Sequence, residues 1–166
     1  GGILAGYVFA RVKKMDFWKY FDLVVPSIAL AQGFGRIGCF LAGCCYGTET
    51  TSPIGIVFHE SQFAPNGVPL VPTQTISSIL NFLHFFVLII FAKHKKADGQ
   101  VAALYLILYS IGRFILEFYR GDLIRGTVGQ LSTSQFISIF VCIAGVILFI
   151  ISGKRNPITK ETDSGN

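Results

Sequence analysis

The sequence predicts an all-α fold, a polytopic integral membrane helix bundle with four complete spans and a truncated first span. Of its 166 residues 52% are hydrophobic and only 14% charged, and the mean hydropathy is +0.60. That composition is too apolar for an ordinary soluble domain of this length. Four apolar runs also have nearly the ~20 residues that cross a ~30 Å hydrocarbon core. They are 23–42, 76–92, 101–118 and 133–152.

A shorter apolar run, 1–10, precedes these four. The chain starts at Gly1 without an initiator methionine or a signal-peptide pattern. We therefore expect it to be the C-terminal part of a longer protein. Residues 1–153 are expected to form one transmembrane domain, and the polar segment 154–166 a disordered cytoplasmic tail.

Lys and Arg residues are distributed unevenly among the predicted loops. Segments 11–21, 93–100 and the C-terminal tail carry ten of the fourteen, whereas 43–75 carries none. Because basic loops stay on the cytoplasmic side, these three segments are predicted to be cytoplasmic. The same placement accounts for the formal net charge of +5. We therefore expect no nucleic-acid partner.

Two arginines, Arg36 and Arg113, lie inside the predicted spans. A guanidinium at the bilayer centre costs at least about 2.5–3.5 kcal/mol, so both should face a polar cavity, an acidic partner or an anionic ligand. Glu117 shares a helix face with Arg113, four residues away, and an intrahelical pair could neutralise that arginine. Such a pair leaves Arg36 as an excess positive charge suited to an anion.

Glycines crowd the segment around Arg36 and extend into the loop that follows; they are Gly33, Gly35, Gly38, Gly43 and Gly47. Close packing against another helix is one interpretation. The alternative is irregular backbone that lines a cavity, because non-helical backbone at membrane depth is tolerated only there.

The loop 43–75 is the longest connection, and it carries four prolines and the turn signal Asn66-Gly67. Its run 54–58 is either a short strand or an interfacial segment. Gln74 follows at the membrane edge, as a helix-terminal polar residue or as a ligand contact. Before the last span, Ser132 or Thr133 can cap the helix, with Gln135 in its first turn.

Three of the four cysteines, Cys39, Cys44 and Cys45, cluster near one end of the 23–42 span. A disulfide from Cys39 to either neighbour remains open in an oxidising compartment. A zinc site needs more ligands than the nearby His59 and Glu60 offer, so no metal site is expected. Cys142, within the last span, is interpreted as a small buried apolar residue.

Four ordered segments, 35–47, 72–74, 109–120 and 131–135, resemble the motifs of bacterial prolipoprotein diacylglyceryl transferases. The resemblance covers nearly the whole chain. It implies transfer of the diacylglyceryl group of phosphatidylglycerol to the lipobox cysteine of a prolipoprotein, forming a thioether and releasing glycerol phosphate. It also implies a multi-pass protein of the bacterial plasma (inner) membrane, with its cavity toward the outer leaflet.

The resemblance further implies that the partners are phosphatidylglycerol, the prolipoprotein signal peptide with its lipobox cysteine, and membrane lipids, without a cofactor. Guanidinium groups suit this reaction because the leaving phosphate gains negative charge. The implied catalytic residues are Arg36, Arg113 and Glu117. The implied phosphatidylglycerol-binding residues are Arg36, Gly35, Gly38, Gly47, Gln74, Arg113, Arg120 and Gln135.

The chain departs from the family pattern at five positions. The family has Asn, Asn and Glu where this sequence has Cys39, Ala42 and Cys44, and His and Glu where it has Val71 and Ser77. Two alternative functions therefore stay open. One is non-catalytic binding or transport of an anionic lipid, and the other is a membrane thiol redox protein centred on the clustered cysteines.

Overall fold

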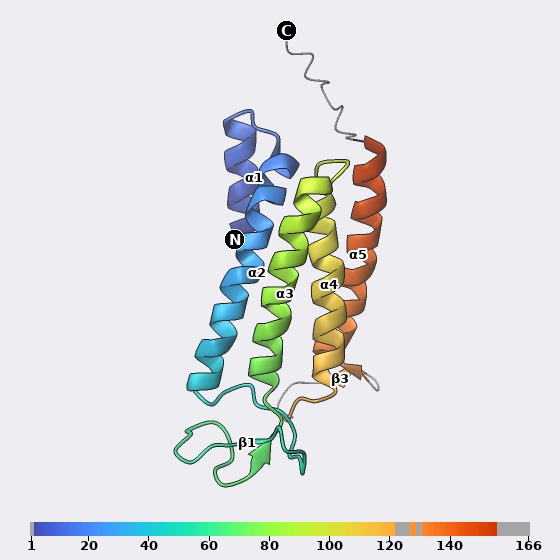
Figure 1. Cartoon of the computed structure of the whole chain (residues 1–166). Helices are drawn as coiled ribbons and strands as arrows, with labels where there is room; N and C mark the ends of the chain where they lie inside the picture. The colour runs from blue at the N-terminus through green and yellow to red at the C-terminus, as the bar shows by residue number, and fades with distance from the viewer. Residues whose placement is uncertain (1, 122–126, 129–130, 156–166) are drawn as a thin grey trace.

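The computed structural model describes residues 2–121, 127–128 and 131–155, and its long helices run alongside one another as a bundle (Figure 1). The helices are α1 Gly2–Val12, α2 Phe17–Leu41, α3 Thr73–His94, α4 Gln100–Glu117 and α5 Thr133–Arg155. Two antiparallel pairs of two-residue strands lie in the loops. They are β1 Ile56–Val57 with β2 Pro69–Leu70, and β3 Thr127–Val128 with β4 Leu131–Ser132. The predicted all-α bundle is confirmed.

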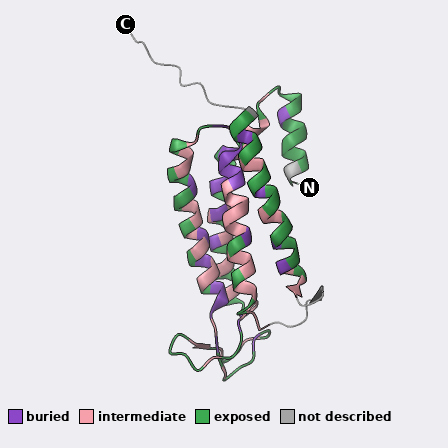
Figure 2. Ribbon diagram, turned by 90° about the vertical axis from the view of Figure 1, so that its right-hand side faces the viewer, coloured by how far each residue is buried: buried purple, intermediate pink, exposed green. Residues whose placement is uncertain are grey.

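The helices pack largely in chain order: α2 on α3, α3 on α4, and α4 on α5, while α1 lies against α2. The core where α2, α3 and α4 meet is built from small and branched side chains, Val25, Ala29, Leu88, Val101 and Ala102. Buried residues gather where the helices face one another (Figure 2). This packing holds α2 and α4, which carry the two intramembrane arginines, on either side of α3.

Four helices, α2 to α5, are long and apolar enough to cross a membrane. Their outward faces carry large exposed apolar side chains, such as Phe86 and Ile90 of α3 and Ile143 and Ile147 of α5. Large apolar surfaces of this kind are unusual on a soluble monomer but suit contact with lipid. The chain is a multi-pass membrane protein.

The two ends of the bundle differ in composition. Segments 13–16 and 95–99 lie at the end where α5 finishes, and the long loop 42–72 lies at the opposite end (Figure 1). The first end is therefore the Lys-rich one that the sequence assigns to the cytoplasm. Lys154 and Arg155 still belong to α5, and the remainder of the predicted tail, 156–166, lies outside the described residues.

Only one of the glycines in α2 makes a close helix contact. A Cβ added at Gly33 would lie 2.8 Å from the ring of Phe82 in α3. At Gly35 and Gly38, both exposed, an added Cβ would meet nothing within 4 Å in the described part of the chain. Close packing therefore applies to Gly33 and not to the other two.

Candidate functional site

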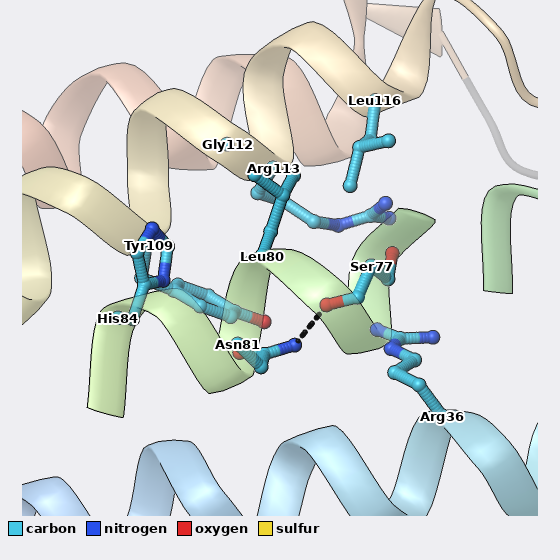
Figure 3. A pocket seen from close by; sticks show the side chains of 9 residues that line it. All are labelled: Arg36, Ser77, Leu80, Asn81, His84, Tyr109, Gly112, Arg113 and Leu116. Atoms are coloured by element: carbon cyan, nitrogen blue, oxygen red, sulfur yellow. Dashed lines mark hydrogen bonds between the residues drawn. The ribbon is translucent and has the colours of Figure 1, made fainter. Parts of the chain in front are cut away.

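Arg36 of α2 and Arg113 of α4 line one polar cavity beside α3. In Figure 3 both side chains extend toward Ser77, which lies on the helix between them. The cavity measures about 20 Å³, and a water needs roughly 10–15 Å³ of such volume. A phosphate therefore enters only if a lining side chain moves.

The two arginines differ in how they are held. Arg113 Nη1 lies 2.9 Å from Glu117 Oε2 in an ion pair, and its Nη2 donates a 2.9 Å hydrogen bond to Ser134 Oγ of α5. Glu117 is fixed in turn, because its Oε1 accepts a hydrogen bond from Ser132 Oγ. Arg36, in contrast, forms no hydrogen bond or ion pair with any residue that the structure describes. The cavity thus contains one neutralised arginine and one uncompensated positive charge.

Polar residues of α3 complete the cavity wall. Ser77, Asn81 and His84 share one helix face, and Asn81 Nδ2 donates a 2.8 Å hydrogen bond to the Ser77 carbonyl (Figure 3). His84 Nδ1 is buried without a hydrogen-bond partner among the described residues. None of the three was predicted from the sequence as a cavity residue. Their spacing of four and three in an otherwise apolar span was the available signal.

A second, adjoining cavity extends from the arginines toward the loop. Arg36 and Arg113 line it together with Cys45, Gln74 and Arg120. Gln74 is buried, and its Nε2 donates a 2.8 Å hydrogen bond to the Cys44 carbonyl, while its Oε1 has no hydrogen-bond partner in the described chain. Four of the predicted binding residues, the two arginines with Gln74 and Arg120, are thus brought together.

Gly47 has a structural reason to be glycine. Its N–H donates a 3.0 Å hydrogen bond to the Val71 carbonyl, and its backbone forms a bridge with Arg120. An added Cβ would lie 2.5 Å from the Val71 oxygen and 2.8 Å from the Tyr119 oxygen. The close approach of these three segments, which brings Arg120 to the second cavity, requires a residue without a side chain.

The other predicted binding residues lie apart from both cavities. Gln135 is buried in the first turn of α5, where its Oε1 accepts a hydrogen bond from the Ser132 N–H and its own N–H donates to Ser132 Oγ. This reciprocal pair is a capping box, so Ser132 is the cap. Gly35 and Gly38 are exposed and line neither cavity.

An apolar groove of about 670 Å³ lies between α3 and α4. It adjoins the first of the two cavities, the one lined by Arg36, Arg113 and the polar face of α3, which is called the arginine cavity below. Its lining is mainly aliphatic, with Ile76, Leu108, Ile111 and Ile115. The groove shares Leu80, His84, Gly112 and Leu116 with the arginine cavity. A molecule with a negatively charged head and an apolar body would find both environments side by side.

The three clustered cysteines are free thiols, so neither of the disulfides considered from the sequence is present. Their sulfur atoms all lie within 4.8 Å of one another. Burial, and then the neighbouring Cys39 and Cys45, raise the pKa of Cys44 from 9.0 to about 11. Because the thiolate is the reactive form, Cys44 alone is a weak nucleophile at neutral pH.

Comparison with known proteins supplies the family. A family model described as prolipoprotein diacylglyceryl transferase matches residues 1–151. A protein of Clostridium tetani (strain Massachusetts / E88) named phosphatidylglycerol–prolipoprotein diacylglyceryl transferase is 54% identical over 155 residues, covering 93% of this chain and 62% of the relative. A Clostridium perfringens (strain 13 / Type A) protein named phosphatidylglycerol–prolipoprotein diacylglyceryl transferase 2 is 53% identical over 162 residues, covering 98% of this chain and 62% of the relative.

A Clostridioides difficile (strain 630) protein, also named phosphatidylglycerol–prolipoprotein diacylglyceryl transferase, is 40% identical over 156 residues, covering 94% of this chain and 59% of the relative. The chain therefore spans about three fifths of the length of these relatives. The match covers α2, α3, α4, most of α5 and both arginines. The chain belongs to the prolipoprotein diacylglyceryl transferase family.

Proposed function

We propose that this protein is a membrane transferase that moves the diacylglyceryl group of phosphatidylglycerol onto the lipobox cysteine of a prolipoprotein. One observation carries the proposal: Arg36, unpaired among the described residues, shares a cavity with Arg113. An unpaired guanidinium within an apolar span is costly unless a ligand neutralises it. The phosphate of an anionic phospholipid is such a ligand, and the names of the relatives specify phosphatidylglycerol.

The reaction gives the two arginines different roles. The acceptor sulfur bonds to the terminal carbon of the diacylglyceryl group as the bond from that carbon to the phosphate oxygen breaks. The released glycerol phosphate gains negative charge, and fixed guanidinium groups in a water-poor site stabilise it. Arg36 binds the phosphate and, together with Arg113, stabilises the negative charge that it gains on leaving, while Glu117 positions Arg113 through their 2.9 Å ion pair.

The shape of the site suits a phospholipid. The phosphate enters the arginine cavity when Arg36 moves, and no hydrogen bond to a described residue opposes that movement. Asn81, His84 and Tyr109 line the same cavity and offer hydrogen bonds to the hydroxyls of the headgroup glycerol. The apolar groove between α3 and α4 accommodates an acyl chain.

The proposed setting is the bacterial plasma (inner) membrane, with the arginine cavities toward the outer leaflet. The support is that the basic segments lie at the opposite end of the bundle from Gln74 and Arg120. The partners are phosphatidylglycerol, the signal peptide of the prolipoprotein with its lipobox cysteine, and surrounding membrane lipids. No cofactor is included in this proposal.

The test replaces Arg36 in the full-length protein by Ala and by Lys. Arg36→Ala should slow lipidation of a synthetic prolipoprotein signal peptide by about 100-fold or more, the usual effect of losing one transition-state donor. Arg36→Lys should recover part of the rate, because it restores charge without the two-pronged guanidinium geometry. The matched control is Arg11→Ala, an exposed arginine at the end of α1, which should change nothing.

Release of glycerol phosphate is measured together with phosphatidylglycerol binding. Unchanged lipidation in Arg36→Ala would refute the proposed role. A wild-type protein that binds or moves labelled phosphatidylglycerol in vesicles, yet never releases glycerol phosphate with the peptide present, would identify a lipid-binding or transport protein instead.

A further inference from the structure

Three cysteines converge at the end of α2 although they are not regularly spaced in the sequence. Cys39 lies in the last turn of α2, and Cys44 and Cys45 lie in the turn that follows. Gly43 and Cys45 adopt left-handed backbone conformations, with φ of +68° and +60°, and the Cys44 N–H donates a 3.1 Å hydrogen bond to the Cys39 carbonyl. The chain therefore folds back on itself and brings the three sulfur atoms within 4.8 Å of one another.

This turn is fixed to the start of α3. The Cys44 carbonyl accepts a 2.8 Å hydrogen bond from Gln74 Nε2, and the Cys45 carbonyl accepts a 2.8 Å hydrogen bond from Thr73 Oγ1. Both donors are buried. The backbone that carries the thiols is thus preorganised, which lowers the entropic cost of binding a ligand with all three.

We infer that Cys39, Cys44 and Cys45 form a three-thiolate site for a thiophilic d¹⁰ metal ion, Zn²⁺ or Cu⁺. Zinc–sulfur bonds of about 2.3 Å place the sulfurs of a tetrahedral site roughly 3.8 Å apart. Starting from separations within 4.8 Å, each pair needs to close by about 1 Å or less. Soft thiolate ligands select these ions, and a coordinated thiol loses its proton to the metal's charge.

The surroundings favour a metal ion over a disulfide. A disulfide would join two of the sulfurs and leave the third unused, whereas a metal ion engages all three. Cys45 also lines the second cavity together with Arg36 and Arg120. Three thiolates around Zn²⁺ carry one net negative charge, and these arginines provide positive charge next to it.

A use for the metal rests on the proposed function. Three protein ligands leave zinc a fourth position for water or substrate, and one of the three, Cys45, lines a cavity that both arginines also line. The acceptor thiol would bind there and release its proton to water. Its sulfur then bonds to the diacylglyceryl carbon, and the electron pair of the broken carbon–oxygen bond remains on the phosphate held by Arg36 and Arg113.

The test uses full-length protein purified with a phosphine reductant, equilibrated with Zn²⁺ and then freed of unbound metal. Elemental analysis should find about one zinc per chain in the wild type, as for a single site. Each of Cys39→Ser, Cys44→Ser and Cys45→Ser should lose it, and the matched control Cys142→Ser should keep it. Titration with Cd²⁺ should produce a thiolate-to-metal charge-transfer band in the wild type, and an anaerobic Cu⁺ titration identifies the preferred ion.

Several outcomes overturn the site. One is that fully reduced wild-type protein retains neither zinc nor copper. Another is that Cys142→Ser loses as much metal as the other three variants, and a third is that the variants at Cys39, Cys44 and Cys45 all retain the metal as the wild type does. Thermal unfolding of the metal-free proteins shows whether a variant has lost its fold. A readout without mutation is alkylation of the wild-type protein, in which bound metal should protect the three thiols and a chelator should remove that protection. If lipidation is equally fast without metal, the metal has no catalytic use. If the protein binds metal but shows no lipidation under any condition, the transferase proposal is refuted while the metal site still stands.

Discussion

At the scale of single residues, the two intramembrane arginines show what a sequence can and cannot predict. Both positions stood out because charges are rare in apolar spans, and the pairing of Arg113 with Glu117 followed from their spacing. The hydrogen bond from Arg113 to Ser134 could not be predicted, because it depends on how α5 packs against α4. The excess positive charge at Arg36 was expected from the sequence, and the packed bundle adds that no described residue pairs with it.

Gln135 was predicted to bind lipid, but its contacts indicate a role in stability. Its side chain and Ser132 cap α5 reciprocally. Gln135→Ala should therefore lower the free energy of unfolding by about 1 kcal/mol, the usual cost of losing a cap. Phosphatidylglycerol affinity should be unchanged in the folded protein. The measurements are thermal unfolding in detergent and lipid binding, with the exposed Gln62→Ala as control; a loss of lipid affinity at unchanged stability would return Gln135 to the binding site.

At the scale of elements, hydropathy located the four long apolar helices of the described chain but missed where α2 begins. The first complete span was predicted from residue 23, yet α2 begins at Phe17, because Asp16 caps it by accepting a hydrogen bond from the Trp18 N–H. Lys19 and Asp22 interrupt the apolar run and hid this first part of the helix. Asp22 is tolerated there because it is paired, a condition that depends on residues more than seventy positions away.

Asp22 links α2 to the turn before α4. Its carboxylate accepts hydrogen bonds from the Gly99 N–H (2.8 Å), the Ala102 N–H (3.0 Å) and Lys95 Nζ (3.0 Å), and the side chain is 2% exposed. Asp22→Ala should lower the free energy of unfolding by about 3 kcal/mol, because it leaves buried donors and a cation without a partner. The exposed Glu49→Ala should cost less than about 0.5 kcal/mol. Equal stability of the two variants, measured by denaturant unfolding in mixed micelles, would contradict this link.

The pH dependence of this link has a defined sign. Burial alone would lower the pKa of Lys95, but hydrogen bonds and charges from Asp98 and Asp22 outweigh it and raise the pKa above its ordinary 10.5. Because the pKa of Lys95 is raised in the folded protein, the stability that its charged form contributes is fully present below pH 10.5. That contribution is lost as the pH rises through the pKa of Lys95 in the folded protein. The stability difference between wild type and Asp22→Ala should therefore narrow only in strongly alkaline solution.

At the scale of the whole molecule, the sequence predicted the number and order of the spans because the hydrophobic pattern is local. The cavities are not local, since α2 and α4 contribute the arginines, α3 contributes its polar face and Gln74, and the loop adds Cys45. The clustering of the three cysteines was expected from the sequence, but a metal site was not, because only His59 and Glu60 lay near them as further ligands. The approach of the three sulfur atoms to within 4.8 Å of one another depends on the left-handed backbone at Gly43 and Cys45, which the sequence did not reveal.

The final prediction concerns the orientation of the bundle. The basic segments lie at one end, and the long loop, which has no Lys or Arg between residues 43 and 75, lies at the other. The positive-inside rule therefore places Lys13 in the cytoplasm and Gln62 outside. A membrane-impermeant maleimide should label Gln62→Cys in intact cells but label Lys13→Cys only after the membrane is permeabilised, with wild-type labelling as the background of the native thiols. The reverse pattern would place the arginine cavities at the cytoplasmic face. The proposed acceptor, a signal peptide already crossing the membrane, would then have to present its cysteine at that face instead of at the outer face.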